Sequence, residues 1–170
     1  DAIPSKSPLF QANRPLEPQT MKYCLLLFLT ISLTIFTNSA FGEPEKDPVN
    51  GAMKAMDKFM RAFNARNIKE WSESHNYPHV RFASGQVRVW ENTEAFISES
   101  DLSTLIESGW HHSRWIFRDV VLSSPSKVHI ATRFRRFNSD NEPISTYQSL
   151  YIVTLVDGHW GIQARSSLAP

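Results

Sequence analysis

The sequence predicts an α+β fold in which helices come first and long antiparallel strands follow. Over most of residues 47–109, apolar side chains recur every three or four positions, which is the spacing of an amphipathic helix. From residue 113 to residue 167 they alternate with polar side chains, as in strands with one buried face. The two-residue turn Asp157–Gly158 is typical of a tight hairpin, so we expect neighbouring strands to pair antiparallel in one sheet.

Two helices are expected at the start of the domain. Asp47 and Pro48 fit an N-cap followed by a proline at the first helical position. The apolar stripe after them is expected to face the core and consists of Val49, Met53, Met56, Phe59, Met60 and Phe63. Asn67 and Glu70 form a capping-box pattern for a short second helix, which must end before Pro78.

A small hairpin and a third helical region are expected next. Residues 80–82 and 87–90 have the composition of two short strands. Asn92 or Thr93 would cap a helical region whose apolar residues are Phe96, Ile97, Leu102, Leu105 and Ile106. Gly109 follows the last of them and is typical of a helix end.

Four long strands complete the domain, at residues 113–122, 127–137, 144–156 and 159–167. If Val156 pairs with His159 across the last turn, the alternation assigns each strand residue to one of two faces. The inner face, which would cover the helices, is expected to carry Val128, Ile130, Thr132, Phe134, Ser149, Tyr151, Val153, Leu155, Trp160, Ile162, Ala164 and Ser166. The opposite face, solvated or packed on a second subunit, is expected to carry Arg133, Arg135, Thr146, Gln148, Leu150, Ile152 and Arg165.

The segment from Met21 has the layout of a secretory signal peptide. Lys22 precedes an apolar run at residues 25–36, and the small residues Ala40 and Gly42 stand before the expected cleavage point. The run is well short of the roughly 20 residues that cross a bilayer. We therefore expect export to the periplasm or the extracellular space, with no stable membrane anchor after cleavage. An uncleaved anchor is the alternative.

The chain is expected to divide into three parts. Residues 1–20, with four prolines and no periodicity, are expected to be a non-native, disordered upstream extension. Residues 21–42 are the signal peptide, and residues 43–170 form one domain. That domain has 15 basic and 15 acidic residues, out of 18 and 17 in the whole chain, so nucleic acid is not an expected partner. Cys24, the only cysteine, lies in the signal, so no disulfide is expected.

The order of these elements resembles that of NTF2-like, or SnoaL-like, domains. The likeness rests on residues 59–67 at the end of the first helix and on residues 158–162 in the last strand, and residues 76–85 also look like uncharacterised members of the group. It covers roughly residues 48–168. The resemblance implies a cone in which a curved antiparallel sheet wraps around about three N-terminal helices and leaves a cavity at its wide end. It also implies a homodimer formed through the sheet.

Ketosteroid isomerase, which has this layout, uses a carboxylate base together with a tyrosine and a protonated aspartic acid. This sequence departs from that pattern. The region after the second helix offers His75, Asn76 and Tyr77 in place of a carboxylate, and the expected inner face carries no acidic residue. A steroid-isomerase mechanism is therefore not expected.

His75 is the candidate catalytic residue. A neutral imidazole at the cavity mouth could take a proton from an acidic carbon or a hydroxyl group. The alternative is a histidine that is hydrogen-bonded at a helix end. Tyr77 would lie beside it as a ligand-binding residue, whereas His79 and Arg81 face the other way if Val80 is buried.

Four further residues are candidates for ligand binding. Tyr147, Tyr151 and Ser166 are expected on the inner face, where a ligand could satisfy hydroxyl groups that otherwise bond within the core. Trp90 could form part of an apolar pocket wall. No cofactor is expected. A metal site is not expected either, because Pro78 prevents a helix from bringing two nearby histidines together.

Three functions remain open at this point. The first is binding of a small, partly apolar molecule in the cone. The second is an isomerase or dehydratase that uses His75 with Tyr147 or Tyr151 as acid and base groups. The third is a non-catalytic homodimeric interaction module whose cavity is filled by side chains.

Overall fold

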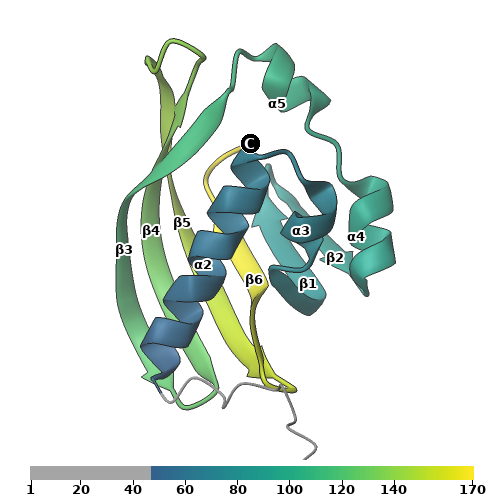
Figure 1. The fold of residues 1–170 in the computed structure, drawn as a ribbon, viewed down its shortest axis with the longest axis vertical. Coiled ribbons are helices and arrows are strands. Elements are labelled where there is room, and N and C mark those ends of the chain that lie inside the picture. Colours follow the sequence, from purple (N-terminus) through teal and green to yellow (C-terminus); the bar gives the residue numbers. More distant parts are fainter. Residues whose placement is uncertain (1–46) are drawn as a thin grey trace, which may run out of the picture. The chain divides into compact units, whose positions relative to one another are not determined.

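The structure, a computed structural model, describes residues 47–170 (Figure 1). Its helices are α2 (Pro48–Asn64), α3 (Ile68–Ser72), α4 (Thr93–Glu99) and α5 (Ser103–Glu107). Its strands are β1 (His75–Ala83), β2 (Gln86–Trp90), β3 (His112–Ser124), β4 (Lys127–Phe137), β5 (Pro143–Val156) and β6 (His159–Ser167). The signal peptide expected at residues 21–42 and the extension expected at residues 1–20 lie outside the described residues.

The strands of the described residues form one six-stranded sheet in the order β2-β1-β6-β5-β4-β3. Among these strands only β1 and β6 pair in parallel, and all other neighbours are antiparallel. The predicted α+β class, with a curved sheet against a few helices, is confirmed (Figure 1). The predicted strand at residues 80–82 was too short, since β1 already begins at His75 and pairs there with Ile162 of β6.

The predicted helix starts are confirmed by side-chain caps. The side chain of Asp47 accepts a hydrogen bond from the backbone nitrogen of Val49 at 3.0 Å. Asn67 does the same for Glu70, and Asn92 for Ala95, at 3.1 and 2.9 Å. None of the helices between residues 47 and 170 is long and apolar enough to cross a membrane.

The third helical region is split, which the sequence analysis did not foresee. α4 ends at Glu99, and α5 begins at Ser103. Between them the carboxylate of Asp101 accepts hydrogen bonds from the backbone nitrogen and the hydroxyl of Ser103, at 2.8 and 2.6 Å. These local hydrogen bonds compete with continuation of α4. The chain therefore starts a new helical turn at Ser103.

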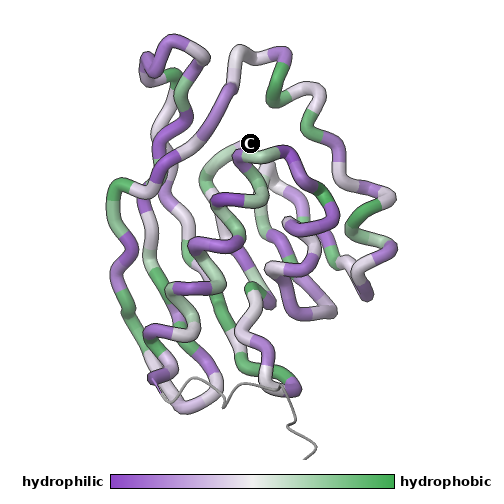
Figure 2. Tube along the Cα trace, viewed as in Figure 1, coloured by the Kyte–Doolittle hydropathy of each residue, from purple (hydrophilic) through white to green (hydrophobic). Residues whose placement is uncertain are grey.

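Helix α2 packs along the concave face of the sheet, across β4, β5 and β6 (Figure 1). Along these strands apolar and polar residues alternate, as Figure 2 shows. The apolar residues face the helix, and Met56, Val153 and Ile162 have no exposed surface. Helix and sheet approach most closely at Gly51, where an added Cβ would collide with the indole ring of Trp160. The core therefore requires glycine at residue 51.

The inner face follows the predicted alternation up to a β-bulge in β6. Val153 pairs with Ile162, but the next residue of β5, Ile152, pairs with Ala164. Gln163 is the extra residue, and it reverses the side to which the following side chains point.

The bulge makes three of the predicted orientations wrong. Ala164 was expected inside, but it pairs with Ile152 of the outer face. Ser166 was expected inside and is exposed, whereas Arg165 was expected outside and lies opposite the buried Tyr151 on the inner face. Ser167 takes the inward position in place of Ser166. Its hydroxyl accepts a hydrogen bond from Ser149 at 2.9 Å.

Candidate functional site

Helices α4 and α5 lie toward one end of the concave face (Figure 1). Residues of both line a cavity of about 600 Å³. Each helix of residues 47–170 contributes to its lining, and so do the strands of this range other than β3. Its volume is within the range of small-molecule sites in proteins, about 300–1,000 Å³. We take this cavity as the candidate functional site.

The helical side of the cavity is aromatic. Phe59 and Phe63 of α2 stack with their ring centroids 6.1 Å apart. Phe96 of α4 meets Trp71 of α3 and Trp90 of β2 edge-on, at 5.0 and 5.3 Å. Because interlocked rings have few rotamers and no charge, this wall offers a preformed surface to an apolar ligand.

Two histidines of β1 line the cavity next to this wall, and both are buried. The Nδ1 atom of His75 lies 2.8 Å from the carbonyl oxygen of Trp71, and Nδ1 of His79 lies 3.1 Å from that of Ile162. A carbonyl oxygen only accepts hydrogen bonds, so Nδ1 carries the proton in both rings. In the neutral state Nε2 of each ring then holds a lone pair.

Burial keeps both histidines neutral at pH 7. It lowers the pKa of His75 well below its usual value, and the nearby His79 adds to this effect. It also lowers the pKa of His79 to about 4. The two ring centroids are 4.2 Å apart. The pair can therefore act as hydrogen-bond acceptors or as bases, but they add no positive charge to the cavity.

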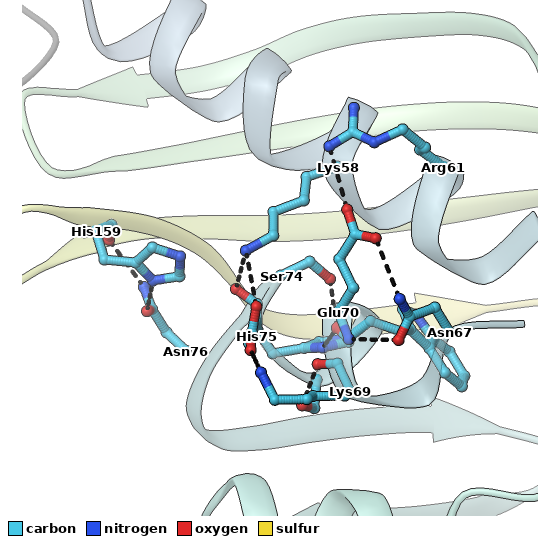
Figure 3. A network of polar contacts seen from close by, with 12 residues as sticks. Lys58, Arg61, Asn67, Lys69, Glu70, Ser74, His75, Asn76 and His159 are labelled. Carbon is cyan, nitrogen blue, oxygen red and sulfur yellow. Dashed lines mark hydrogen bonds and ion pairs between the residues drawn. The ribbon is translucent and has the colours of Figure 1, made fainter. Parts of the chain in front are cut away.

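A polar network fixes the chain where β1 begins (Figure 3). The buried side-chain amide of Asn76 donates to the carbonyl and the hydroxyl oxygen of Thr154 at 2.8 and 2.9 Å, and its oxygen accepts from Nδ1 of His159. On the other side, Lys58 of α2 donates to the carbonyl oxygen of Glu73 at 3.1 Å. These bonds hold His75 in place between α2 and the sheet.

The strand side of the cavity carries arginines. Arg81 of β1, Arg136 of β4 and Arg165 of β6 all line it. The guanidinium carbon of Arg136 lies 5.0 Å from the ring centroid of Tyr147, and that of Arg165 lies 5.7 Å from the ring centroid of Tyr151. These cation–π contacts orient the two planar groups against the sheet.

No acidic side chain between residues 47 and 170 forms an ion pair with any of these three arginines. The Nε atoms of Arg136 and Arg165 are buried without a hydrogen-bond partner. Burial, together with the positive charges of Arg165 and Arg88, lowers the pKa of Arg81 to about 10. The strand side therefore carries uncompensated positive charge.

Two acidic residues, Glu99 and Asp101, line the cavity from the helical side. The hydrogen bonds from Ser103 lower the pKa of Asp101 and direct its carboxylate toward the start of α5. The described residues contain no group of three or more histidine, cysteine or acidic side chains placed to hold a metal ion. The predicted absence of a metal site stays a prediction.

A family model described as NTF2-like protein (DUF6841) matches residues 50–169. The chain belongs to this NTF2-like family. The resemblance stated from residues 59–67 and 158–162 is thereby confirmed. A comparison with curated proteins found no match to the chain.

Solved structures share this NTF2-like fold at low sequence identity. An NTF-2 like protein of unknown function from Shewanella oneidensis MR-1 is 11% identical, with a TM-score of 0.59 over 72% of this chain and 99% of that protein. A ketosteroid isomerase-like protein from Erwinia carotovora atroseptica SCRI1043 is 14% identical, with a TM-score of 0.54 over 74% and 100%. A Catenulispora acidiphila protein in complex with S-DNPA is 13% identical, with a TM-score of 0.54 over 71% and 91%. These likenesses show the fold and nothing further.

The NTF2-like cavity brings together three of the six predicted site residues, His75, Trp90 and Tyr147. Tyr151 lies beneath it, fully buried, and lines a small adjoining cavity of about 20 Å³. Tyr77 does not line either cavity. Its hydroxyl donates to the carbonyl oxygen of Ser72 at 3.0 Å, and burial raises its pKa to about 12. Ser166 is on the outer surface, as described above.

Several residues that line the cavity were not among the candidates. Arg136 continues the alternation of Thr132 and Phe134 on β4, so the pattern would have placed it inside. His79 and Arg81 line the cavity because Val80 and Phe82 do not fill the inner face, and Phe82 is 47% exposed. For Arg165 the sequence holds no such signal, since the alternation read through the bulge assigns it to the outside.

Proposed function

We propose that this NTF2-like domain is exported and binds a small, partly apolar molecule in its cavity. The observation that carries the proposal is the contrast between the two sides of the cavity: rings from α2, α3 and α4 on one side, and polar groups from β1, β4 and β6 on the other. Small-molecule sites typically combine an apolar lining with a few convergent polar groups. Export is supported by the signal-like segment that begins at Met21.

The ionisation states of the cavity residues support binding at neutral pH. Neutral His75 and His79 accept hydrogen bonds, whereas the arginines donate them. One related structure, the Catenulispora acidiphila protein, is a complex with S-DNPA, so the fold accommodates a bound molecule there. Dimerisation through the sheet stays a prediction.

A second function, acid–base catalysis, is favoured by one specific observation. The Nδ1 bond to Trp71 leaves the lone pair of His75 on Nε2, in a ring that lines the cavity and is neutral at pH 7. A neutral imidazole of this kind can remove a proton from a bound molecule. The two tyrosines predicted to act with His75 differ in their access to the cavity. Tyr147 lines the same cavity, whereas Tyr151 lies beneath it.

Native mass spectrometry of the full chain tests the binding function. Ser145 lines the cavity from β5, so Ser145→Trp would fill it, whereas Gln148→Trp adds the same side chain at an exposed position of the same strand. We expect a retained small molecule, or added 2-naphthol, on the wild type and on Gln148→Trp, and none on Ser145→Trp. The proposal would be contradicted if both variants carried the molecule to the same extent. It would also be contradicted if the wild type carried no molecule in any condition. Conversion of the molecule by the wild type but not by His75→Gln would establish catalysis.

A further inference from the structure

Arg136 and Arg165 come together at the floor of the cavity. They lie on β4 and β6, with β5 between them, and both line the main cavity and the small adjoining one. Tyr147 and Tyr151 of the intervening strand hold the two guanidinium groups by cation–π contacts. The pair is therefore positioned by neighbouring strands of one sheet.

No ion pair between residues 47 and 170 balances the charge of this pair. Arg81 also lines the cavity, but its guanidinium donates to the carbonyl oxygen of Pro170 at 3.3 Å. The guanidinium of Arg136 forms no hydrogen bond or ion pair between residues 47 and 170, and its Nε is buried. The guanidinium of Arg165 bonds there only to the hydroxyl of Tyr151. Charges that lose water without gaining a partner are costly. An anion at this place would remove that cost.

The positive charge is local and does not follow from the composition. Residues 43–170 carry 15 basic and 15 acidic side chains, so the domain as a whole is neutral. The basic groups gather on the strand side, while the helical side opposite them presents aromatic rings such as those of Phe63, Trp71 and Phe96, with Glu99 and Asp101 also in the lining. A molecule that satisfies both sides must have a negative end and an apolar body.

We propose that the ligand is a small carboxylic acid with an aromatic or aliphatic body, whose carboxylate pairs with Arg136 and Arg165. This inference rests on the proposed binding function and gives the ligand its chemical class. Guanidinium groups match a carboxylate in planarity and can bind both of its oxygens. The apolar body then lies against the aromatic wall.

Calorimetric titration of the full chain with matched probes tests this assignment. The probes are phenylacetate and 2-naphthoate, each paired with its primary amide, which has the same shape without the charge. We expect the acid of a pair to bind at least about tenfold more tightly than the amide, because hydrogen bonds to charged groups are the stronger ones. A higher salt concentration should weaken binding of the acid and leave binding of the amide unchanged.

The variants are Arg136→Gln, Arg165→Gln and, as a control, Arg133→Gln, which removes one positive charge from the exposed face of β4. Each of the first two should lose about tenfold or more in affinity for the acid, and the control should not. Arg165→Lys keeps the charge and loses the planar fork, so its loss should be intermediate. It also serves if Arg165→Gln does not fold.

The outcomes separate this inference from the binding function. Equal affinity for acid and amide, or unchanged acid binding in both glutamine variants, overturns the carboxylate site and leaves the binding function standing. Failure of every acid and every amide to bind the wild type at millimolar concentration overturns both. Selective loss of acid binding in the Arg136 and Arg165 variants establishes the site.

Discussion

The concave face of the sheet is filled with hydrophobic side chains at one end and hollow at the other, although β4, β5 and β6 run through both ends. At the filled end α2 covers Val128, Val153 and Ile162, which have no exposed surface. At the hollow end the same strands carry Arg136, Tyr147 and Arg165 beneath the short helices α4 and α5. The two ends therefore differ in the residues that the shared strands carry and in the helices that cover them.

This difference assigns stability and binding to different regions. A packed core stabilises a domain through the apolar area that it removes from water and through close contact between its atoms. The side chains that line a cavity lack contact atoms on one side, and arginines without a partner cost free energy. Replacing the arginines of the hollow end should therefore cost less stability than truncating the core.

The largest effect is expected from truncation in the filled end. Met56→Ala removes a fully buried side chain of α2 and should lower the free energy of unfolding by about 2–5 kcal/mol. Leu105→Ala, in the helix that covers the cavity, should cost about 1 kcal/mol or less, because that side chain is only partly buried. Urea unfolding of the full chain measures both. Similar losses for the two variants would show that the cavity end contributes as much to stability as the core.

The second-largest effect is expected at acidic pH, which should destabilise the hollow end. The folded-state pKa of His79 is about 4, against 6.5 in the unfolded chain, so the unfolded state binds more protons between these values. Stability is therefore full above about pH 6.5 and falls as the pH is lowered toward 4, by about 3 kcal/mol for this residue. The pKa of His75 is lowered too, which adds a loss of the same sign.

The matched variants for this effect are His79→Asn and His111→Asn. An asparagine amide can donate to the carbonyl oxygen of Ile162 as Nδ1 of His79 does, but it does not titrate. His79→Asn should therefore flatten the dependence of unfolding free energy on pH. His111→Asn makes the same replacement at an exposed position and serves as the control. His75 should leave a smaller slope in the His79→Asn variant, so a slope as steep as that of the wild type would refute the assignment of part of the acid sensitivity to His79.

The sequence predicted those parts of the fold that depend on neighbouring residues. The caps at Asp47, Asn67 and Asn92 are local hydrogen bonds, so the residue types alone reveal them. The alternation of apolar and polar residues along β4 and β5 can be recognised in each strand alone. The turn at Asp157–Gly158 fixes the register of β6 against β5. These features together were enough to predict the α+β class and the filled end.

Much of the hollow end depends on features that cannot be predicted from neighbouring residues in the sequence. The bulge at Gln163 inserts one residue without interrupting the polar and apolar pattern around it. Ala164, Arg165 and Ser166 were therefore assigned to the wrong faces. Likewise, the apolar Val80 and Phe82 suggested an inner face that the tertiary structure gives to His79 and Arg81. The roles proposed for His75, Trp90 and Tyr147 stay predictions, although all three line the cavity.

The smallest of these effects tests the bulge itself, which is the point on β6 where the filled end gives way to the hollow one. The hydroxyl of Ser167 accepts hydrogen bonds from Ser149 at 2.9 Å and from the backbone nitrogen of Ala169 at 3.2 Å, and all three residues are buried. Ser167→Ala leaves both donors without a partner and should lower the free energy of unfolding by about 1–2 kcal/mol.

Ser166→Ala is the matched control, because it makes the same change one residue earlier on the opposite face. Ser166 is exposed, so its replacement should change the free energy of unfolding by no more than about 0.5 kcal/mol. A continuous alternation without the bulge requires the reverse order, with Ser166→Ala the costlier variant. Urea unfolding of the two variants thus decides which residues of β6 face inward. Arg165 precedes both and keeps its place in the cavity only if Ser167 proves to be the buried one.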